Sequence, residues 1–413
     1  MANKKDKKGR VLKEGEDQLK DGRYRYRYTD TNGKRHAVYS WKLTITDRLP
    51  SGKRQCKSLR EKEADLQKDL ADGIDTYGAQ ITVNELIERY LATKVGIVLS
   101  TKNYYLRMWK SHIKESSLGK KPISKVKNSD ITMLYAHLSK VDNLANATIS
   151  TMHGFINPAF KMAVKDNLIR TNPCSGCLHD YKVEETTRTS LTKQEQKAIL
   201  NFLQNGGSVY SFYYPLIYFL SETGLRISEA FGLTWENIDF NKKIIHVNHQ
   251  LIYEKVDGSY QYYITLPKNK KTRDVPFSDD LAKVLNQYWE DTKSLRAITS
   301  YNVDGFTNFI FYTRFGKLFN LSVSTRLFRQ IKNAYNSEEE LKAKVENRQQ
   351  LRLDNFTAHV LRHTFCTRMA ELGMDIKVLQ TIMGHNDIKI TMQVYNHVNE
   401  TRLLDEFSRI KNS

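Results

Sequence analysis

The sequence AHVLRHTF, at residues 358–365, is the stretch on which the interpretation of this chain depends. In a helix, His359 and Arg362 are three residues apart, so their side chains share one face. Downstream, a Gly-His pair at residues 384–385 ends a short helical pattern, as glycine commonly does at a helix C-terminus. Tyr395 follows ten residues after that histidine. The C-terminal part of the chain therefore holds two histidines, an arginine and a tyrosine at defined spacings.

Further cationic side chains lie upstream of this stretch. Residues 223–229 read TGLRISE and open a helix with Arg226 in its first turn. A pair of strands predicted over residues 261–277 presents three lysines in its turn: Lys268, Lys270 and Lys271. Taken singly, an arginine or histidine on an amphipathic helix is usually structural, and a chain with 23 tyrosines needs no special reason for one more. The ordered set is more informative than any member.

In these residues the chain resembles the tyrosine recombinases, the phage integrase family of site-specific DNA recombinases. The family pattern is an early arginine, a hairpin lysine, a His-x-x-Arg pair, a Gly-His and a tyrosine about ten residues later. Here the pattern falls on Arg226, Lys268, His359, Arg362, His385 and Tyr395. The chain is most similar to integrases of conjugative transposons and Gram-positive prophages. The resemblance implies DNA cleavage and rejoining that integrates and excises a mobile element.

The resemblance gives the cations a role that their charge supports. A phosphodiester is anionic, and its pentacoordinate transition state gathers further charge on the non-bridging oxygens. Arg226 and Arg362 would clamp those oxygens with permanently charged, planar guanidinium groups. His385 would add a third hydrogen bond to the phosphate. Glu229 lies one helical turn after Arg226, so we expect it to support that arginine rather than to touch DNA.

The remaining residues would move protons. Tyr395 has a reference pKa near 10, so the attacking phenol needs a base, which would be His359. The product is a 3′-phosphotyrosyl link, which keeps the bond energy for rejoining. Lys268 would protonate the departing 5′ oxygen, although the neighbouring Lys270 and Lys271 remain alternatives. These roles, which follow from the resemblance, require no cofactor and no metal.

Composition restricts the class of protein independently of the motifs. The chain has 413 residues, with 65 Lys and Arg against 46 Asp and Glu, and its formal charge of +19 favours a polyanionic partner. This length favours two or three domains, and the 40% hydrophobic content is typical of a globular protein. The sequence has no apolar run long enough for a membrane span and only four cysteines, too few for a disulfide scaffold. We therefore expect a cytoplasmic protein without membrane contact.

Nearly half of the excess positive charge lies in the first 70 residues, which hold 20 Lys and Arg against 11 Asp and Glu. Arg23, Arg25 and Arg27 alternate with tyrosines, so a strand there places guanidinium groups on one face and aromatic rings on the other. We expect this arginine face to bind DNA, because a sheet fits the major groove. The alternative is a solvated face on an ordinary hairpin.

The chain is predicted to be a mainly α multidomain protein (α+β). Residues 1–75 would form an arm-type DNA-binding domain with a three-stranded sheet, its third strand at Trp41–Thr46, and a helix over residues 58–72. Residues 80–175 would form a helical bundle that binds the core site, followed by a linker at residues 176–190. The catalytic domain, residues 191–413, would combine helices with a small sheet that includes strands at 243–251, 261–266 and 273–277, with a further short strand possible at Phe309–Thr313. The charged run 337–352 either extends a helix or forms a surface insertion.

Two segments carry open alternatives. Cys174 and Cys177, with His179 nearby, match the start of a zinc site, but a fourth ligand has no evident source, which favours a loop with two free thiols. After Tyr395, residues 400–412 carry an apolar stripe that needs something to bury it. In the family such a tail packs on a neighbouring subunit in a ring of four, whereas in one molecule it would cover the core.

The partners implied are double-stranded DNA at core and arm sites, a homotetramer on that DNA, and helper proteins: an excisionase and a DNA-bending host protein. Two rival functions remain. A type IB topoisomerase uses similar chemistry and relaxes supercoils as a monomer. A catalytically inactive DNA-binding regulator would bind DNA without cutting it, although every expected catalytic residue type is present.

Overall fold

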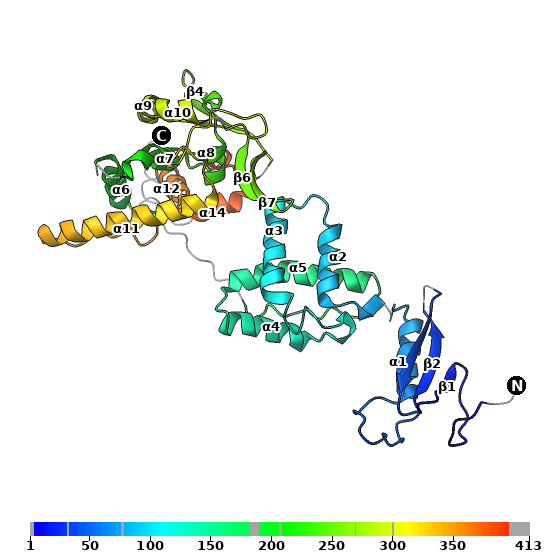
Figure 1. The fold of residues 1–413 in the computed structure, drawn as a ribbon. Helices are drawn as coiled ribbons and strands as arrows, with labels where there is room; N and C mark the ends of the chain where they lie inside the picture. Colours follow the sequence, from blue (N-terminus) through cyan, green and yellow to red (C-terminus); the bar gives the residue numbers. More distant parts are fainter. Residues whose placement is uncertain are drawn as a thin grey trace, which may run out of the picture. The chain divides into compact units, whose positions relative to one another are not determined.

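The computed structural model divides the chain into two compact units, residues 1–185 and 186–413 (Figure 1). The structure describes residues 4–30, 33–75, 78–181, 190–205, 209–268, 270–299 and 301–395. No helix in these ranges is long and apolar enough to cross a lipid bilayer. The apolar stripe at residues 400–412 and most of the predicted linker lie outside the described residues.

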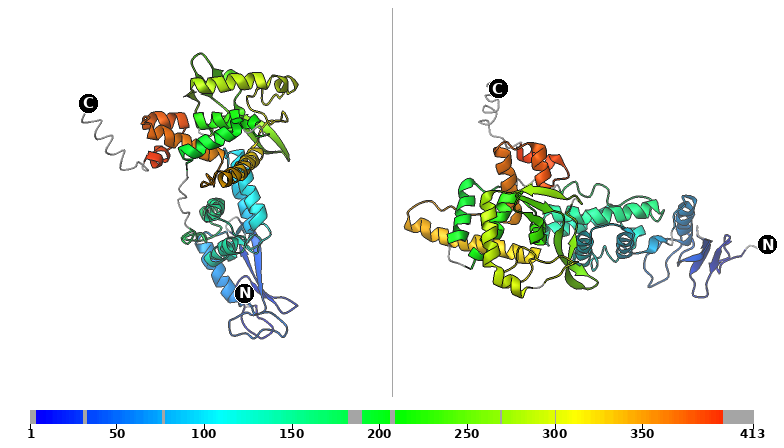
Figure 2. Two further views of the ribbon diagram at one scale, coloured as in Figure 1. Left: turned by 90° about the vertical axis from the view of Figure 1, so that its left-hand side faces the viewer. Right: turned by 90° about the horizontal axis from the view of Figure 1, so that it is seen from above.

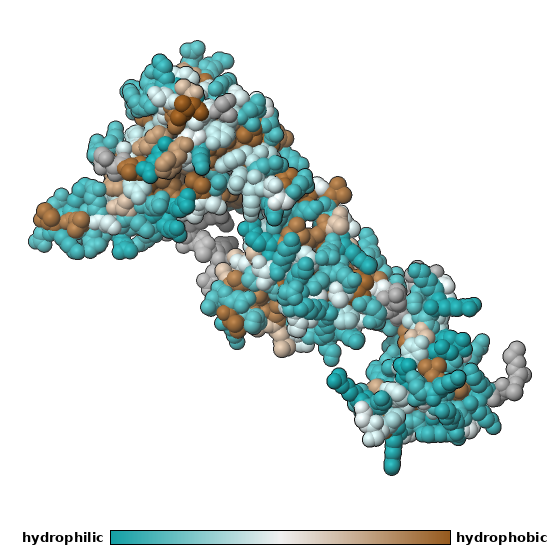
Figure 3. Space-filling model, viewed as in Figure 1, coloured by the Kyte–Doolittle hydropathy of each residue, from teal (hydrophilic) through white to brown (hydrophobic). Residues whose placement is uncertain are grey.

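The first unit opens with an antiparallel sheet and a helix that packs on it. The sheet has the order β1-β2-β3, and its elements are β1 (Glu16–Gln18), β2 (Tyr24–Thr29), β3 (Arg35–Ser40) and α1 (Leu59–Ala71). Ser58 and Glu61 form a reciprocal capping box at the start of α1, which fixes where the helix begins. Tyr24, Leu43 and Leu59 are buried between sheet and helix. The outer face of this region is mostly hydrophilic in Figure 3.

The predicted three-stranded sheet is confirmed, but one of its strands was assigned wrongly. The third strand is β1, which precedes β2, and not Trp41–Thr46. The Asp47 carboxylate accepts the backbone N–H groups of Leu43 and Thr44 at 2.7 and 3.1 Å, and the N–H of Asp47 donates to the Thr44 carbonyl. These bonds close a local turn and use the groups that a strand would offer to a neighbour.

Helices make up the rest of the first unit. They are η1 (Gly78–Gln80), α2 (Val83–Thr93), α3 (Leu99–Met108), η2 (Trp109–Ile113), η3 (Ile123–Lys125), α4 (Asn128–Lys140) and α5 (Asn146–Lys165). Thr82 and Glu85 form a capping box at the start of α2. Tyr135, Phe155 and Phe160 are fully buried among these helices. The bundle predicted from helical periodicity is therefore present.

The bundle core continues beyond the predicted boundary at residue 175. Cys174 and Cys177 are both buried in it, and Tyr181 packs against the same core. Cys177 lies beside the Asn128 side chain, whose amide also donates to the carbonyls of Pro173 and Ser175. The predicted linker therefore begins too early. Among the described residues, no group of His, Cys, Asp or Glu is arranged to hold a metal ion.

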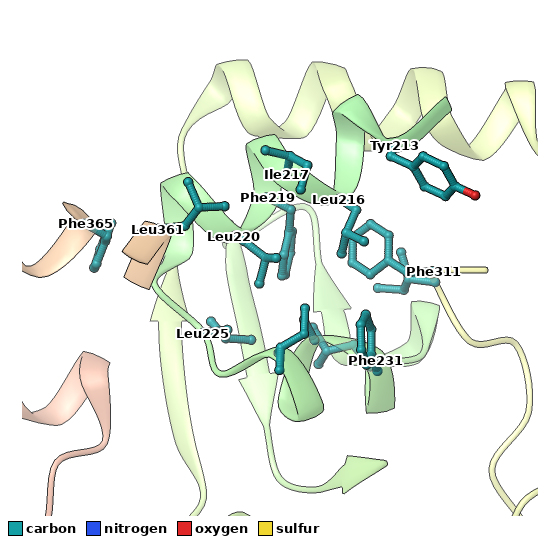
Figure 4. Close-up of a cluster of buried hydrophobic side chains, with 14 of the residues drawn as sticks. Tyr213, Leu216, Ile217, Phe219, Leu220, Leu225, Phe231, Phe311, Leu361 and Phe365 are labelled. Atoms are coloured by element: carbon teal, nitrogen blue, oxygen red, sulfur yellow. The ribbon is translucent and has the colours of Figure 1, made fainter. Parts of the chain in front are cut away.

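The second unit surrounds a large aromatic core with helices. Its helices are α6 (Lys193–Asn205), η4 (Ser211–Tyr213), α7 (Tyr214–Thr223), α8 (Ile227–Gly232), η5 (Trp235–Asn237), α9 (Asp279–Asp291), α10 (Lys293–Ile298), α11 (Leu321–Val345), α12 (Ala358–Glu371), α13 (Ile376–Met383) and α14 (Ile388–Tyr395). Phe219 on α7, Phe231 on α8 and Phe311 meet in the core shown in Figure 4. Helices α12, α13 and α14 pack against one another (Figure 2).

Two small sheets cross this unit. Their strands are β4 (Ile238–Asp239), β5 (Ile244–Val247), β6 (Gln250–Val256), β7 (Ser259–Thr265) and β8 (Arg273–Pro276). One sheet has the order β4-β5-β8 and the other pairs β6 with β7. The predicted strand pair over residues 261–277 is therefore wrong, because β7 and β8 belong to different sheets. Residues 309–313 make only isolated bridges, so no strand forms there.

The turn between β6 and β7 explains the actual pairing. Asp257 and Gly258 have φ angles of +47° and +93°, as the two central residues of a type I′ hairpin turn require. An Asp-Gly pair between alternating strands is a strong hairpin signal, and here it joins β6 to β7. Strand β8 is left to pair with β5, where Ile245 faces Val275.

The charged run 337–352 combines the two predicted alternatives. Helix α11 extends through it to Val345, and the chain then folds back on the helix. Arg348 pairs with Glu339, which also accepts the backbone N–H of Leu351 at 2.8 Å. The run is thus a helical extension followed by a return segment that an ion pair holds in place.

We predict that Phe219→Ala destabilises the second unit by about 3–5 kcal/mol, because it empties a fully buried site. The ring of Phe219 lies edge-on to Phe311, with centroids 5.1 Å apart. Chemical denaturation of the full chain measures the change. The control is Phe315→Ala, at a site that is 71% exposed, where the change should stay within about 0.5 kcal/mol. Equal effects of the two substitutions would contradict the assigned core.

Candidate active site

The site begins where α7 ends and α8 starts. Gly224 closes α7 with a φ of +61°, and a Cβ at this position would lie 2.4 Å from the Phe365 ring. Only glycine fits such a turn at such a distance. Two residues later Arg226 caps α8, and its backbone N–H donates to the Glu229 carboxylate at 3.0 Å. The chain therefore reverses sharply and holds Arg226, which is partly buried, at the start of a short helix.

Glu229 is fully buried beneath two guanidinium groups. Arg226 donates to it at 2.9 Å, and Arg273, the first residue of β8, donates through two nitrogens at 2.6 and 3.1 Å. Burial alone would raise the pKa of Glu229, but hydrogen bonds and charge from Arg273, together with Arg226, outweigh it and lower the pKa below its usual value. Glu229 is thus an ionised carboxylate at the centre of the cluster.

Arg362 on α12 is also buried, with 8% of its surface exposed. It donates to the Gly224 carbonyl at 2.7 Å and to the Met383 carbonyl, so it binds the C-terminal ends of α7 and α13. These ends carry the negative partial charge of the helix dipole. Burial, and then the charges of Arg226 and Arg273, lower the pKa of Arg362. The site therefore holds an excess of positive charge that an anion would relieve.

His385 lies just after the C-terminal end of α13. Gly384 closes α13 with a φ of +61°, and its carbonyl accepts a hydrogen bond from Arg226 at 2.8 Å. The Nδ1 atom of His385 lies 2.9 Å from the hydroxyl of Thr391, a fully buried residue of α14. One short segment thus joins Arg226, His385 and the helix that carries the predicted nucleophile.

The other predicted site residues stand at the edge of this cluster. His359 is exposed in the first turn of α12, one turn before Arg362 on the same face. Tyr395 is the last residue of α14; the placement of its side chain lies outside the described part. Lys268 is exposed in the connection from β7 to β8, and in the described ranges no contact joins it to the arginines. The structure thus brings Arg226, Arg362 and the His385 segment together, whereas Lys268 lies in a link between sheets rather than a hairpin turn.

Sequence reasoning missed Arg273. Its side chain is only 5% exposed, and its Nε donates to the Ile382 carbonyl at 2.7 Å. A Cβ on Gly384 would lie 3.1 Å from the Arg273 guanidinium, so this glycine also makes room for the arginine. The available signal was weak, because Arg273 looks like the polar start of a strand. Its carboxylate partner is 44 residues away along the chain.

The arginines of the N-terminal sheet form the second predicted DNA-binding surface. Arg25 donates to Asp17 on β1 at 2.9 Å, and Arg27 lies 3.6 Å from the same carboxylate. The Arg27 side chain is 60% exposed, whereas that of Arg25 is 29% exposed. Arg23 pairs with Asp21 at 2.7 Å and lies over the ring of Tyr39. Asp17 therefore partly neutralises this face.

Comparison with known families agrees with this organisation. Residues 189–402 match the phage integrase family, and residues 1–70 match the DNA-binding domain of Tn916 integrase. The first match includes every predicted catalytic residue, and the second includes Arg23 and the two arginines of β2, Arg25 and Arg27. The two matches lie in different structural units.

Full-length relatives and a solved structure extend the match. The chain is 35% identical to the transposase from transposon Tn1545 of Streptococcus pneumoniae and 34% identical to that from Tn916 of Enterococcus faecalis. Each alignment covers 98% of this chain and 96% of the relative. A Tn1549 transposon integrase, solved in complex with transposon right-end DNA, superposes with a TM-score of 0.69 at 31% identity. It covers 80% of this chain and 100% of that structure.

We predict that Gly384→Ala destabilises the protein by more than Gly373→Ala. Both glycines follow helices and have positive φ angles, so alanine costs about 1–2 kcal/mol of backbone strain at each. A Cβ at Gly373 meets nothing within 4 Å, whereas one at Gly384 displaces the Arg273 guanidinium. Thermal unfolding of both variants measures the difference. Equal losses would mean that Arg273 does not pack on Gly384.

Proposed function

Since the chain belongs to the phage integrase family, we propose that its arginine cluster holds a DNA phosphate while Tyr395 attacks it. The protein is a tyrosine-type site-specific recombinase, an integrase like those of Tn916 and related transposons. The observation that carries the assignment of the site is the buried cluster in which Arg226, Arg273 and Arg362 surround one carboxylate, Glu229. Three positive charges against one negative charge favour a bound anion.

The cluster would stabilise the transition state. Charge grows on the non-bridging oxygens as the phosphorus becomes pentacoordinate, and fixed donors in a site of low dielectric constant bind that charge strongly. Arg226, with its side chain 19% exposed, would reach the phosphate most directly. Arg362 is more deeply buried, so in our proposal it acts from the floor of the site. His385 would donate a further hydrogen bond from its ring, whose Nδ1 contacts Thr391.

The proton transfers balance without hydrolysis. The Tyr395 oxygen forms a bond to phosphorus as the bond from phosphorus to the 5′ oxygen breaks. His359 would accept the phenolic proton, and Lys268 would donate one to the departing oxygen. The exposed position of Lys268 in a connection between two sheets supports a residue that approaches DNA from outside the cluster. The reverse steps would rejoin a different 5′ end and thereby exchange strands.

The finer division into DNA-binding parts is also a proposal. Residues 1–75 would bind arm sites, the helical bundle from residue 80 onward, whose core extends to Tyr181, would bind the core site, and residues 191–413 would bind the scissile phosphate. The match of residues 1–70 to a known DNA-binding domain supports the first assignment. A homotetramer on DNA, joined through the C-terminal tail, would exchange strands in two sequential pairs, aided by an excisionase and a DNA-bending host protein. We place this reaction in the cytoplasm.

Two other functions make different predictions. A type IB topoisomerase would relax a supercoiled plasmid that lacks the element ends, whereas an integrase of this kind should leave it supercoiled. An inactive regulator would bind DNA without forming a covalent intermediate. The near full-length match to transposon enzymes favours the integrase over both.

We predict that the protein forms a covalent adduct with element-end DNA in the presence of EDTA. The substrate is a labelled duplex with a nick near the cleavage point, which lets the short fragment diffuse away and traps the enzyme on the strand. The adduct should survive SDS and disappear after protease digestion. Tyr395→Phe should abolish it while DNA binding stays within about twofold, because only the nucleophilic oxygen is lost.

Tyr301→Phe serves as the matched control, since it removes a hydroxyl from another tyrosine of the catalytic unit outside the arginine cluster. It should form adduct at the wild-type rate. An adduct that persists in Tyr395→Phe would show that another residue is the nucleophile. Tight binding without an adduct on any element end would favour the inactive regulator.

We predict that Asp17→Asn strengthens binding of arm-site DNA by about 3–10-fold, because it removes the negative charge that partly neutralises Arg25 and Arg27. Arg27→Ala should instead weaken binding and reduce the slope of log K against log salt by about 1. Fluorescence anisotropy over a salt series measures both. Asp65→Asn removes an exposed carboxylate of α1, which pairs with Lys57, and should have a smaller effect. Weaker binding by Asp17→Asn would contradict the proposed arginine face.

A further inference from the structure

Arg273 occupies an unusual position for a residue that starts a strand. Its guanidinium is almost completely buried, makes a two-pronged contact with Glu229 and donates from Nε to the last turn of α13. Gly384, which lies against the same guanidinium, also accepts a hydrogen bond from Arg226. Arg273 therefore contacts α8, α13 and the segment that precedes His385, and lies five residues after Lys268 in the chain.

Arg226 and Arg273 share the Glu229 carboxylate, and this sharing determines how strongly Glu229 binds Arg226. One oxygen of Glu229 accepts from the side chains of both arginines, and the other accepts from Arg273 and from the backbone of Arg226. Without Arg273, Glu229 would be a buried carboxylate with Arg226 as its remaining guanidinium partner. Its charge would then draw Arg226 into a full ion pair. The excess charge of the cluster would also fall from two to one.

We infer that Arg273 is a positioning residue for strand cleavage: it neutralises Glu229, so that Arg226 keeps its charge and outer donors for the scissile phosphate. Arg273 itself does not touch DNA in this arrangement, since its side chain is only 5% exposed and each of its three nitrogens donates to Glu229 or to the Ile382 carbonyl. The inference rests on the proposed function of the arginine cluster. In this arrangement Glu229 supports Arg226, and Arg273 on β8 in turn neutralises Glu229.

A double-mutant cycle tests this role. The rate of adduct formation on the nicked duplex is measured at saturating protein for wild type, Arg273→Gln, Glu229→Gln and the double variant. Arg273→Gln should slow cleavage by about 30-fold or more, because the buried carboxylate then competes for Arg226. In the Glu229→Gln background the same substitution should cost about fivefold or less, since there is no carboxylate left to neutralise. Separate binding curves should show DNA affinity within about threefold of wild type.

A residue that only supported the fold would cost the same in both backgrounds, and that result would overturn the inference. Arg273→Lys provides a second route if Arg273→Gln does not fold. It keeps the charge and should remain within about tenfold of wild type, whereas a loss above about 100-fold would contradict the neutralising role. Arg368→Gln is the matched control. Arg368 also donates to one carboxylate, Glu371, and to one backbone carbonyl, but it lies outside the arginine cluster. This variant should cleave DNA at the wild-type rate.

Failure of the inference differs from failure of the proposed function. If wild type forms no adduct, the recombinase site itself is wrong. If wild type forms the adduct and Arg273→Gln cleaves as fast as Arg368→Gln, only the role of Arg273 is wrong.

Discussion

The buried carboxylate of Glu229 is the point on which the geometry of the catalytic unit depends. An ionised group without solvent must be paired, and here Arg226, three residues before Glu229, and Arg273, 44 residues after it, supply the pairing. That requirement joins the start of α8, the start of β8 and the end of α13 in one place. The glycines that end α7 and α13 let backbone carbonyls meet Arg226 and Arg362 closely. Three arginine side chains thus lie together in a largely buried site, where unpaired charges are normally excluded.

Local signals in the sequence predicted the helices well. The capping boxes at Thr82 and Thr192 mark the starts of α2 and α6, because each depends on residues only three positions apart. Strand pairing was predicted less well, since partners far apart in sequence compete. Residues 41–46 have the composition of a strand, yet the Asp47 carboxylate binds their N–H groups first. Spacing suggested that β7 pairs with β8, although the Asp-Gly turn already joined β6 to β7.

The candidate site shows the same contrast between local signals, which the sequence reveals, and long-range contacts, which it does not. An ordered motif identified Arg226, Arg362 and His385, and the structure brings their segments into contact. No motif identified Arg273, because its importance arises from one long-range ion pair and from the space that Gly384 leaves. The side chain of Tyr395 and the predicted tail lie outside the described residues, and their roles stay predictions from the sequence. Sequence therefore named most candidate chemical groups, and tertiary contacts revealed what holds them.

The topology of the small sheets has a consequence for the length of the β6–β7 hairpin. Strands β5 and β8 pair with each other, so β6 and β7 form an arm inserted into the loop of a simpler hairpin. The base of this arm is fixed, because Gln250 bonds to Ser228 and β6 packs on α8. Its tip, around Asp257, can grow or shrink by pairs of residues without shifting the register of β5 and β8. The length of this hairpin can thus change without displacing Arg273 at the start of β8.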